Sequence, residues 1–205
     1  TAWFSTLFGR KNFLLLSTIL FTASSALCGM ASSMGMLIFA RVIQGLGGGA
    51  IMPIGQAVMM EEFPVEERGV AMSVFGFGVI FAPIIGPTLG GWITDTYSWH
   101  WIFLINVPVG IIAVILGNLF IEDPPYARKG KVQKVDYIGF ILLIVWLFSL
   151  QVVLDNGQKS DWFGSRWVRW TTALSLSCFI GFIWRELTTK VPIVDLKVFL
   201  DRNFI

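Results

Sequence analysis

A long apolar run near the start of the chain limits what this sequence can fold into. From Phe13 to Met60 there is a single charged residue, Arg41. One helix crosses a bilayer core with about 20 consecutive apolar residues, so this run is long enough for two crossings. The 205-residue chain is 55% hydrophobic and only 14% charged, unlike a soluble domain. The sequence therefore predicts an all-α integral membrane protein.

Charge clusters and turn residues divide the chain into six apolar segments. Their lengths, about 18 to 26 residues, suit tilted transmembrane helices. The segments cover roughly residues 13–33, 36–58, 69–94, 101–121, 137–154 and 168–187. The chain opens without a Met and closes within an apolar restart, so we expect an internal fragment of a longer multi-pass protein.

The basic residues are sorted between alternate connections. Eleven of the fifteen Lys and Arg residues lie in or beside residues 1–12, 59–68, 122–136 and 188–205. The positive-inside rule places these stretches in the cytoplasm and the chain in the cytoplasmic (inner) membrane. Tryptophans gather at the opposite ends of the segments, as expected for the outer interface. A formal net charge of +2 is too small to suggest a nucleic-acid partner.

The stretch "RVIQGLGGGA", residues 41–50, places a charge inside an apolar segment. A charged side chain near mid-membrane costs about 3 kcal/mol by insertion scales, so it usually faces a wet cavity or a partner. A helical wheel puts Arg41 on one face with Gly48 and Met52, flanked by Gln44 and Gln56. We interpret these residues as a cavity wall. The alternative is that Arg41 snorkels to the headgroups.

Small residues recur at every fourth position in two of the segments. Gly45 and Gly49 form a pair that predicts close approach of another helix. In "FGFGVIFAPIIGPTLGG" the repeat is longer and is joined by two prolines, which predict a kink. Its members are Gly78, Ala82, Pro83, Gly86, Pro87 and Gly90. Two interpretations remain open, tight helix packing alone or a bent gate that closes one end of a pathway.

Several motifs in order resemble one family. "RVIQGLGGGA" and "APIIGPTLGG" resemble the fourth- and fifth-helix motifs of drug:proton antiporters in the major facilitator superfamily, and "FGRK" resembles the end of their cytoplasmic loop motif. "WHWIFLINVPVG", "LDNGQKSDWFGS" and "VPIVDLKVF" are similar to the fourteen-helix, EmrB/QacA-like branch. The resemblance implies that the six segments are helices three to eight of fourteen.

The resemblance also implies a domain organisation. Residues 1–122 would be part of the N-terminal bundle, and 123–136 a cytoplasmic linker. Residues 137–187 would be the extra helix pair, and 188–205 a cytoplasmic segment leading to the C-terminal bundle.

The resemblance assigns roles to matched positions. Arg41 would act in proton coupling, and Gly9, Arg10 and Lys11 would belong to the cytoplasmic loop motif. The antiporter gate motif would comprise Pro83, Gly86, Pro87, Gly90 and Gly91. The chain departs from the family pattern at Thr6 and Leu7, where relatives carry Asp and Arg, and also at Ala82 and His100.

The function implied is proton-coupled efflux of hydrophobic or cationic drugs by alternating access, with no enzyme activity, metal or cofactor. An uncoupled facilitator and a non-transporting scaffold subunit are the alternatives. The acid that pairs with Arg41 is expected in a first helix that this chain lacks. Within this chain the candidate acids are Asp95 and Asp155. An EmrA-like periplasmic adaptor and a TolC-like outer-membrane channel are possible partners on the same resemblance.

Overall fold

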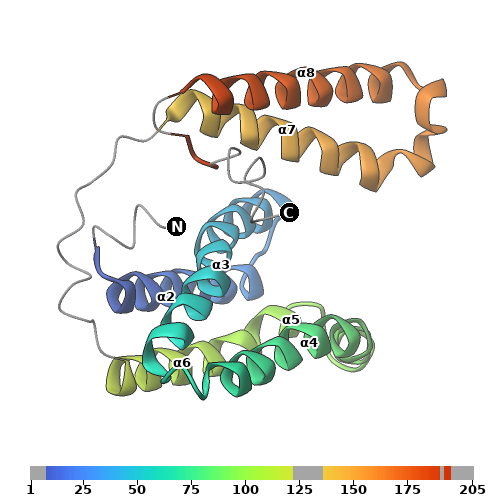
Figure 1. Cartoon of the computed structure of the whole chain (residues 1–205). Helices are drawn as coiled ribbons and strands as arrows, with labels where there is room; N and C mark the ends of the chain where they lie inside the picture. Colours follow the sequence, from blue (N-terminus) through green and yellow to red (C-terminus); the bar gives the residue numbers. More distant parts are fainter. Residues whose placement is uncertain (1–7, 122–135, 190–191, 195–205) are drawn as a thin grey trace. The chain divides into compact units, whose positions relative to one another are not determined.

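The computed structural model describes residues 8–121, 136–189 and 192–194, and the regular structure in these ranges is helical (Figure 1). The chain divides into two compact units, residues 1–132 and 133–205. The first unit contains α2 (Arg10–Gly29), α3 (Met34–Glu62), α4 (Arg68–Thr96), α5 (Trp101–Leu104) and α6 (Asn106–Phe120). The second contains α7 (Tyr137–Asn156), η2 (Gln158–Ser160), η3 (Trp162–Gly164) and α8 (Arg166–Thr188). Of the expected linker only position 136 is described, and of the expected C-terminal segment only 188, 189 and 192–194; positions 6 and 7 also lie outside the described residues.

Five helical stretches are long and apolar enough to cross a membrane: α2, α3, α4, α5 together with α6, and α7. The expectation of an all-α membrane protein is confirmed. The sixth expected span forms the helix α8 but is not among the five. Its hydropathy is lowered by hydroxyl side chains such as Ser175 and by Arg185 and Glu186 near its end.

The fourth expected span is interrupted at Ile105, between α5 and α6. Pro108 explains the interruption, because it has no N–H to donate to the carbonyl of Leu104, four residues earlier. Sequence length alone predicted one continuous segment over 101–121.

Helix α2 is the centre of the first unit, since it packs against α3, α5 and α6. Its buried face is largely small and polar, and it includes Ser17, Ser24, Ser25 and Cys28. Two apolar clusters flank this face. One joins Cys28, Ala40 and Phe103, and the other joins Ala50, Ile54 and Val58.

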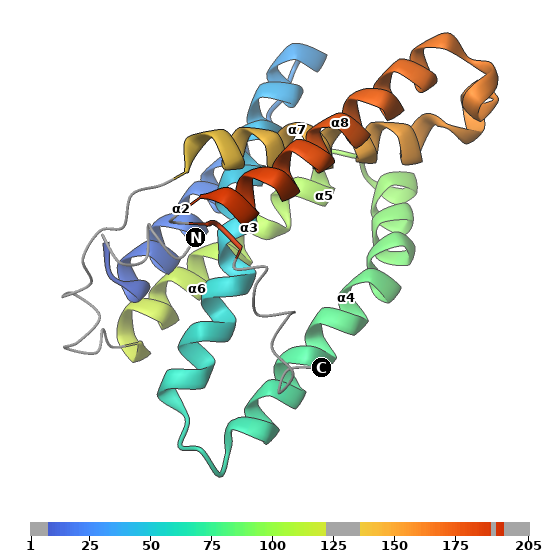
Figure 2. The same cartoon turned by 45° about the horizontal axis from the view of Figure 1, so that its top comes forward.

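Helix α4 is the least covered helix of this unit, with only Ala71 and Ile93 buried. It remains helical through Pro83 and Pro87, and Figure 2 shows its ribbon changing direction along its length. Proline is the usual cause of such a bend, because it removes a backbone hydrogen bond.

The second unit is a hairpin of α7 and α8 whose open end is held by polar contacts. Asp136 caps α7 by accepting hydrogen bonds from the backbone N–H groups of Ile138 and Gly139. The same carboxylate forms a two-point ion pair with Arg185 of α8, at 2.8 and 3.1 Å. Farther along, the Trp146 ring packs on aromatic side chains of α8.

Candidate functional site around Arg41

Arg41 lies in the second turn of α3, and its charged end is held by two neutral groups. Its Nη1 donates a hydrogen bond of 3.1 Å to Oε1 of Gln44, one turn along the helix. Its Cζ lies 4.8 Å from the centre of the Phe103 ring, a distance typical of a cation–π contact. The guanidinium is therefore placed by one amide oxygen and one aromatic face.

Gln44 links Arg41 to helix α2. Its side chain is buried, and Nε2 donates a 2.5 Å hydrogen bond to Oγ of Ser25. The Cys28 thiol lies 4.0 Å from Oε1 of the same amide. Because Nε2 is committed to Ser25, Oε1 remains directed at Arg41. The pattern is a short polar chain across the α2–α3 contact.

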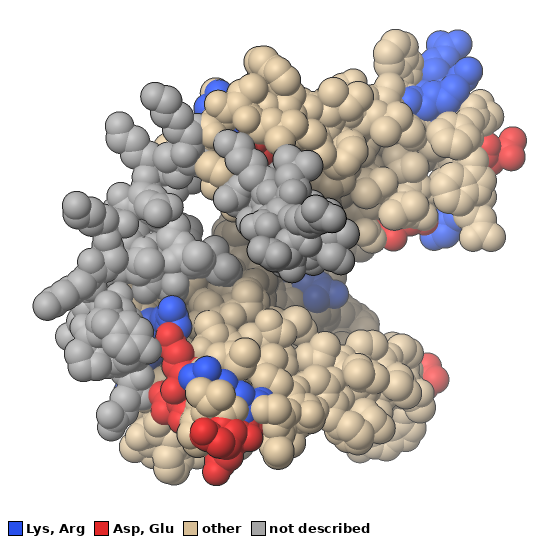
Figure 3. Space-filling model, viewed as in Figure 1, with Lys and Arg blue, Asp and Glu red and all other residues tan. Residues whose placement is uncertain are grey.

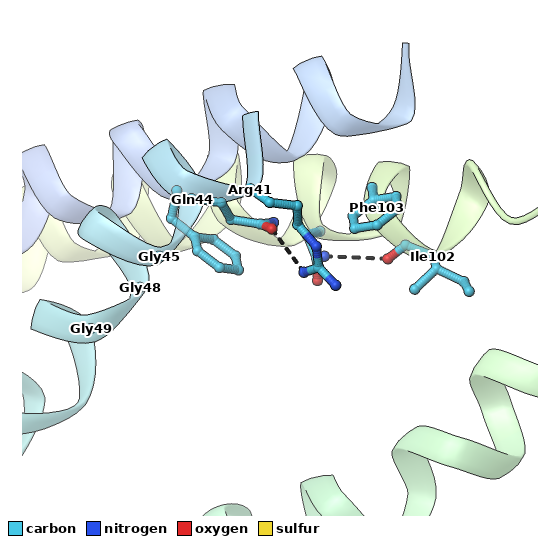
Figure 4. A pocket seen from close by; sticks show the side chains of 9 residues that line it. Arg41, Gln44, Gly45, Gly48, Gly49, Ile102 and Phe103 are labelled. Carbon is cyan, nitrogen blue, oxygen red and sulfur yellow. Dashed lines mark hydrogen bonds between the residues drawn. The ribbon is translucent and has the colours of Figure 1, made fainter. Parts of the chain in front are cut away.

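These side chains border a cavity of about 430 Å³ (Figure 4). Helix α3 contributes the charge, one amide and bare backbone, while α2, α5 and α6 contribute aromatic, aliphatic and amide groups. The lining residues are Phe21, Arg41, Gln44, Gly45, Gly48, Gly49, Ile102, Phe103 and Asn106. Within the described part of the chain, this lining carries one positive charge and no carboxylate.

The structure brings some of the predicted wall residues together and leaves others apart. Gln44 and Gly48 line the cavity beside Arg41, whereas Met52 and Gln56 lie farther along α3, exposed and outside its lining. They lie about 16 and 22 Å along the helix axis from Arg41, since each residue adds about 1.5 Å, and a helical wheel does not show this separation.

Five participants were not predicted: Phe21, Ser25, Ile102, Phe103 and Asn106. Their positions depend on how α2, α5 and α6 pack on α3. The aromatic start of "WHWIFLINVPVG" offered one signal, because aromatic side chains bind a guanidinium through cation–π contacts.

The close approach of another helix to the glycine run occurs at Gly47, not at Gly45 and Gly49 as expected. A Cβ at Gly47 would lie 2.8 Å from backbone atoms of Phe21 and Ser17 in α2. A Cβ at Gly45 or Gly49 would meet nothing within 4 Å in the described structure. Among the described helices, the close contact therefore lies on the Gly47 face, and the expected approach at Gly45 and Gly49 stays a prediction.

The glycines of the predicted gate motif on α4 also have no close neighbour among the described residues. A Cβ at Gly86, Gly90 or Gly91 would meet no atom within 4 Å among the described residues. The described helices therefore do not pack closely on these glycines, and the choice between tight packing and a gate stays open. The role of Pro83, Gly86, Pro87, Gly90 and Gly91 as a gate stays a prediction.

The cytoplasmic loop motif ties three helix ends together. Gly9 precedes α2 with φ of 80°, a conformation that favours glycine. Arg10 forms an ion pair with Glu61 at the end of α3, and Lys11 Nζ donates a 2.8 Å hydrogen bond to the carbonyl of Asn118 in α6. Figure 3 shows acidic and basic side chains gathered where α3 ends and α4 begins.

Asp95 and His100, the titratable candidates in the first unit, are not among the residues that line the cavity. Asp95 is exposed near the end of α4, and Asp155 accepts a 2.9 Å hydrogen bond from Gln151 on α7. His100 bonds to Ser98 and stacks on Trp99. The part of the chain that the structure describes thus offers Arg41 no acid in its cavity.

A comparison of the sequence with models of protein families agrees with the helical membrane fold and with the arginine in an apolar helix. Residues 1–199 match the family model described as Major Facilitator Superfamily. The chain belongs to this family, and with its several apolar helices it is a multi-pass protein of the inner membrane.

Within this family, the chain is similar to proteins named for drug export and for resistance. The chain is 38% identical over 206 residues to the Multidrug export protein EmrB of Haemophilus influenzae, and 41% identical over 204 residues to that of Escherichia coli K12. Each alignment covers all of this chain and 40% of the relative. It is 38% identical over 184 residues to the Fatty acid resistance protein FarB of Neisseria gonorrhoeae, covering 90% of this chain and 36% of FarB. The chain therefore spans about two-fifths of the curated relatives it matches.

Proposed function

We propose that the full-length protein exports hydrophobic or cationic drugs across the inner membrane, in exchange for protons, by alternating access. The observation that carries the proposal is the placement of Arg41 in a cavity, with no carboxylate in the described lining. The names of the EmrB relatives support drug export. The roles of Arg41 in coupling and of Gln44 and Gly48 as a cavity wall are part of this proposal.

The mechanism assigns Arg41 to charge pairing rather than to carrying a proton. A guanidinium stays charged under physiological conditions, so it is unsuited to releasing protons. It can instead hold an acid in its ionised form until a proton or a substrate changes the pairing. We place that acid in the rest of the transporter, beyond the described residues.

The proton gradient is a sufficient energy source in this proposal, without a nucleotide, metal or other cofactor. One charge moving down 100 mV releases about 2.3 kcal/mol, which supports roughly a 50-fold gradient of a neutral drug at one-to-one coupling. An EmrA-like adaptor and a TolC-like channel would carry the drug onward across the periplasm.

The test is drug-driven proton release by full-length protein in vesicles with an imposed pH gradient. Arg41→Ala is expected to abolish proton release, while Arg169→Ala, which removes an arginine from the start of α8, is the matched control. Unimpaired coupling in Arg41→Ala would contradict the proposed role. Drug movement that ignores the gradient would favour an uncoupled facilitator, and no movement of any dye would favour a scaffold subunit.

A further inference from the structure

Arg41 is held by neutral groups among the described residues. Its Nη1 donates a 3.1 Å hydrogen bond to the Gln44 oxygen, and its Cζ lies 4.8 Å from the centre of the Phe103 ring. We propose that Gln44 and Phe103 form a resting seat for Arg41, occupied when the acid that pairs with it carries a proton. Phe103 is then a positioning residue that helps set the pH at which the transporter takes up its proton. This inference rests on the proposed proton coupling.

The amide half of the seat is built from buried groups. Gln44 is 5% exposed and Ser25 is fully buried, so their 2.5 Å hydrogen bond is shielded from water. Ser25 accepts from Nε2, which turns Oε1 toward the arginine. A low local dielectric strengthens such a hydrogen bond and makes the reversed orientation of the amide costly.

The aromatic half is equally constrained. Phe103 is 8% exposed and packs with Cys28 and Ala40, while Trp99 meets its ring edge to face at 6.2 Å. The ring therefore cannot follow Arg41 if the guanidinium moves away. A cation over an aromatic face is attracted by the ring quadrupole, and the attraction depends on the face rather than on ring volume.

Among the described residues, the groups that face Arg41 from neighbouring helices bring no second charge to the seat. From α2 the titratable group is the Cys28 thiol, near the Gln44 oxygen. From α5 and α6 the lining groups are Ile102, Phe103 and Asn106, which do not titrate. His100, before α5, is engaged with Ser98 and Trp99.

The direction of the effect follows from competition between the seat and the acid for one guanidinium. Weakening the seat leaves Arg41 more available to the acid, which favours the ionised acid. Protonation then requires a lower pH. For loss of an ordinary cation–π contact, the expected displacement is about half a pH unit, or roughly a threefold change in proton affinity.

The experiment measures drug-driven proton release against pH in vesicles that contain full-length protein. Phe103→Leu is expected to move the midpoint to lower pH, whereas Phe103→Tyr, which keeps the aromatic face, restores the wild-type midpoint. Phe13→Leu, at a residue packed on the Ala50–Val58 cluster, is the matched control for loss of a ring. Ser25→Ala releases the Gln44 amide and should move the midpoint in the same direction, even if Phe103→Leu does not fold.

Two results would overturn the seat. One is a wild-type midpoint in folded Phe103→Leu or, where that variant does not fold, in Ser25→Ala. The other is an equal displacement in Phe103→Tyr, which would assign the effect to packing. Absence of drug-driven proton release from the wild type would instead overturn the proposed coupling, and the seat with it.

Discussion

Gly47 shows how one missing side chain sets the distance between two helices. The backbones of Ser17 and Phe21 occupy the space that a Cβ at this position would need. Gly45, two residues earlier on the same helix, faces open space among the described residues. Gly47 therefore lies in a tight helix–helix contact, whereas Gly45 does not.

We expect Gly47→Ala to destabilise the protein and Gly45→Ala not to do so. Overpacking a tight contact costs about 1 to 3 kcal/mol, and here the obstructing atoms are backbone. Alanine at Gly45 meets no atom and improves helix propensity. Thermal unfolding of full-length protein in detergent should show a lower melting temperature for Gly47→Ala alone. Equal melting temperatures for the two variants would contradict this contact.

The site around Arg41 was predictable only in part at this scale. An arginine inside an apolar run is visible in the sequence, and so is its amide neighbour one turn away at Gln44. Ser25 and Phe103 are not, because each reaches the site through the packing of a different helix. Helical periodicity gives the angle of a residue around its own axis, whereas the partner depends on how axes cross.

At the scale of elements, the open end of the α7–α8 hairpin depends on one carboxylate. Asp136 has a side chain that is 5% exposed, and the Arg185 guanidinium hydrogen-bonded to it lowers its pKa from 3.8 to about 2 despite burial. The Gly139 N–H and the Thr189 hydroxyl add to this lowering. The ionised carboxylate therefore favours the folded hairpin.

The sign of the resulting pH dependence follows from this lowered pKa. The stabilisation by Asp136 is complete above its unfolded pKa of 3.8 and is lost as pH falls toward about 2. We expect Asp136→Asn to lower the melting temperature at neutral pH and to lower it much less near pH 2. Melting of full-length protein between pH 2 and 7 checks this. Asp155→Asn, at an exposed carboxylate on the same helix, is the matched control and should leave the melting temperature at neutral pH close to that of the wild type.

Hydropathy predicted where the helices begin and end better than it predicted whether each helix is continuous. All six apolar segments are helical, and five of the resulting stretches are long and apolar enough to cross a membrane. The interruption before Pro108 needed a local backbone argument instead. Proline acts on the carbonyl four residues earlier, so the break falls near Leu104 rather than at the proline itself.

At the scale of the whole molecule, the bare ridge of α4 is the feature that this stretch of chain leaves unexplained. The described helices place nothing within 4 Å of a Cβ at Gly86, Gly90 or Gly91. A packing partner of this ridge would lie outside the described neighbours of α4, and this chain spans only 40% of its EmrB relatives. A small-residue ridge is suited to close helix contact.

We expect Gly86→Val to impair drug export or to permit proton leak without unfolding the helices described here. Added methyl groups on the ridge would clash only when another helix closes on it, so the effect belongs to the transport cycle. Ile84→Phe adds volume to an exposed position on the opposite side of α4 and is the matched control. Export and passive proton leak, measured in vesicles of full-length protein, separate the two variants. Equal behaviour of Gly86→Val and the wild type in both assays would leave the prolines, rather than the glycines, as the functional part of the motif.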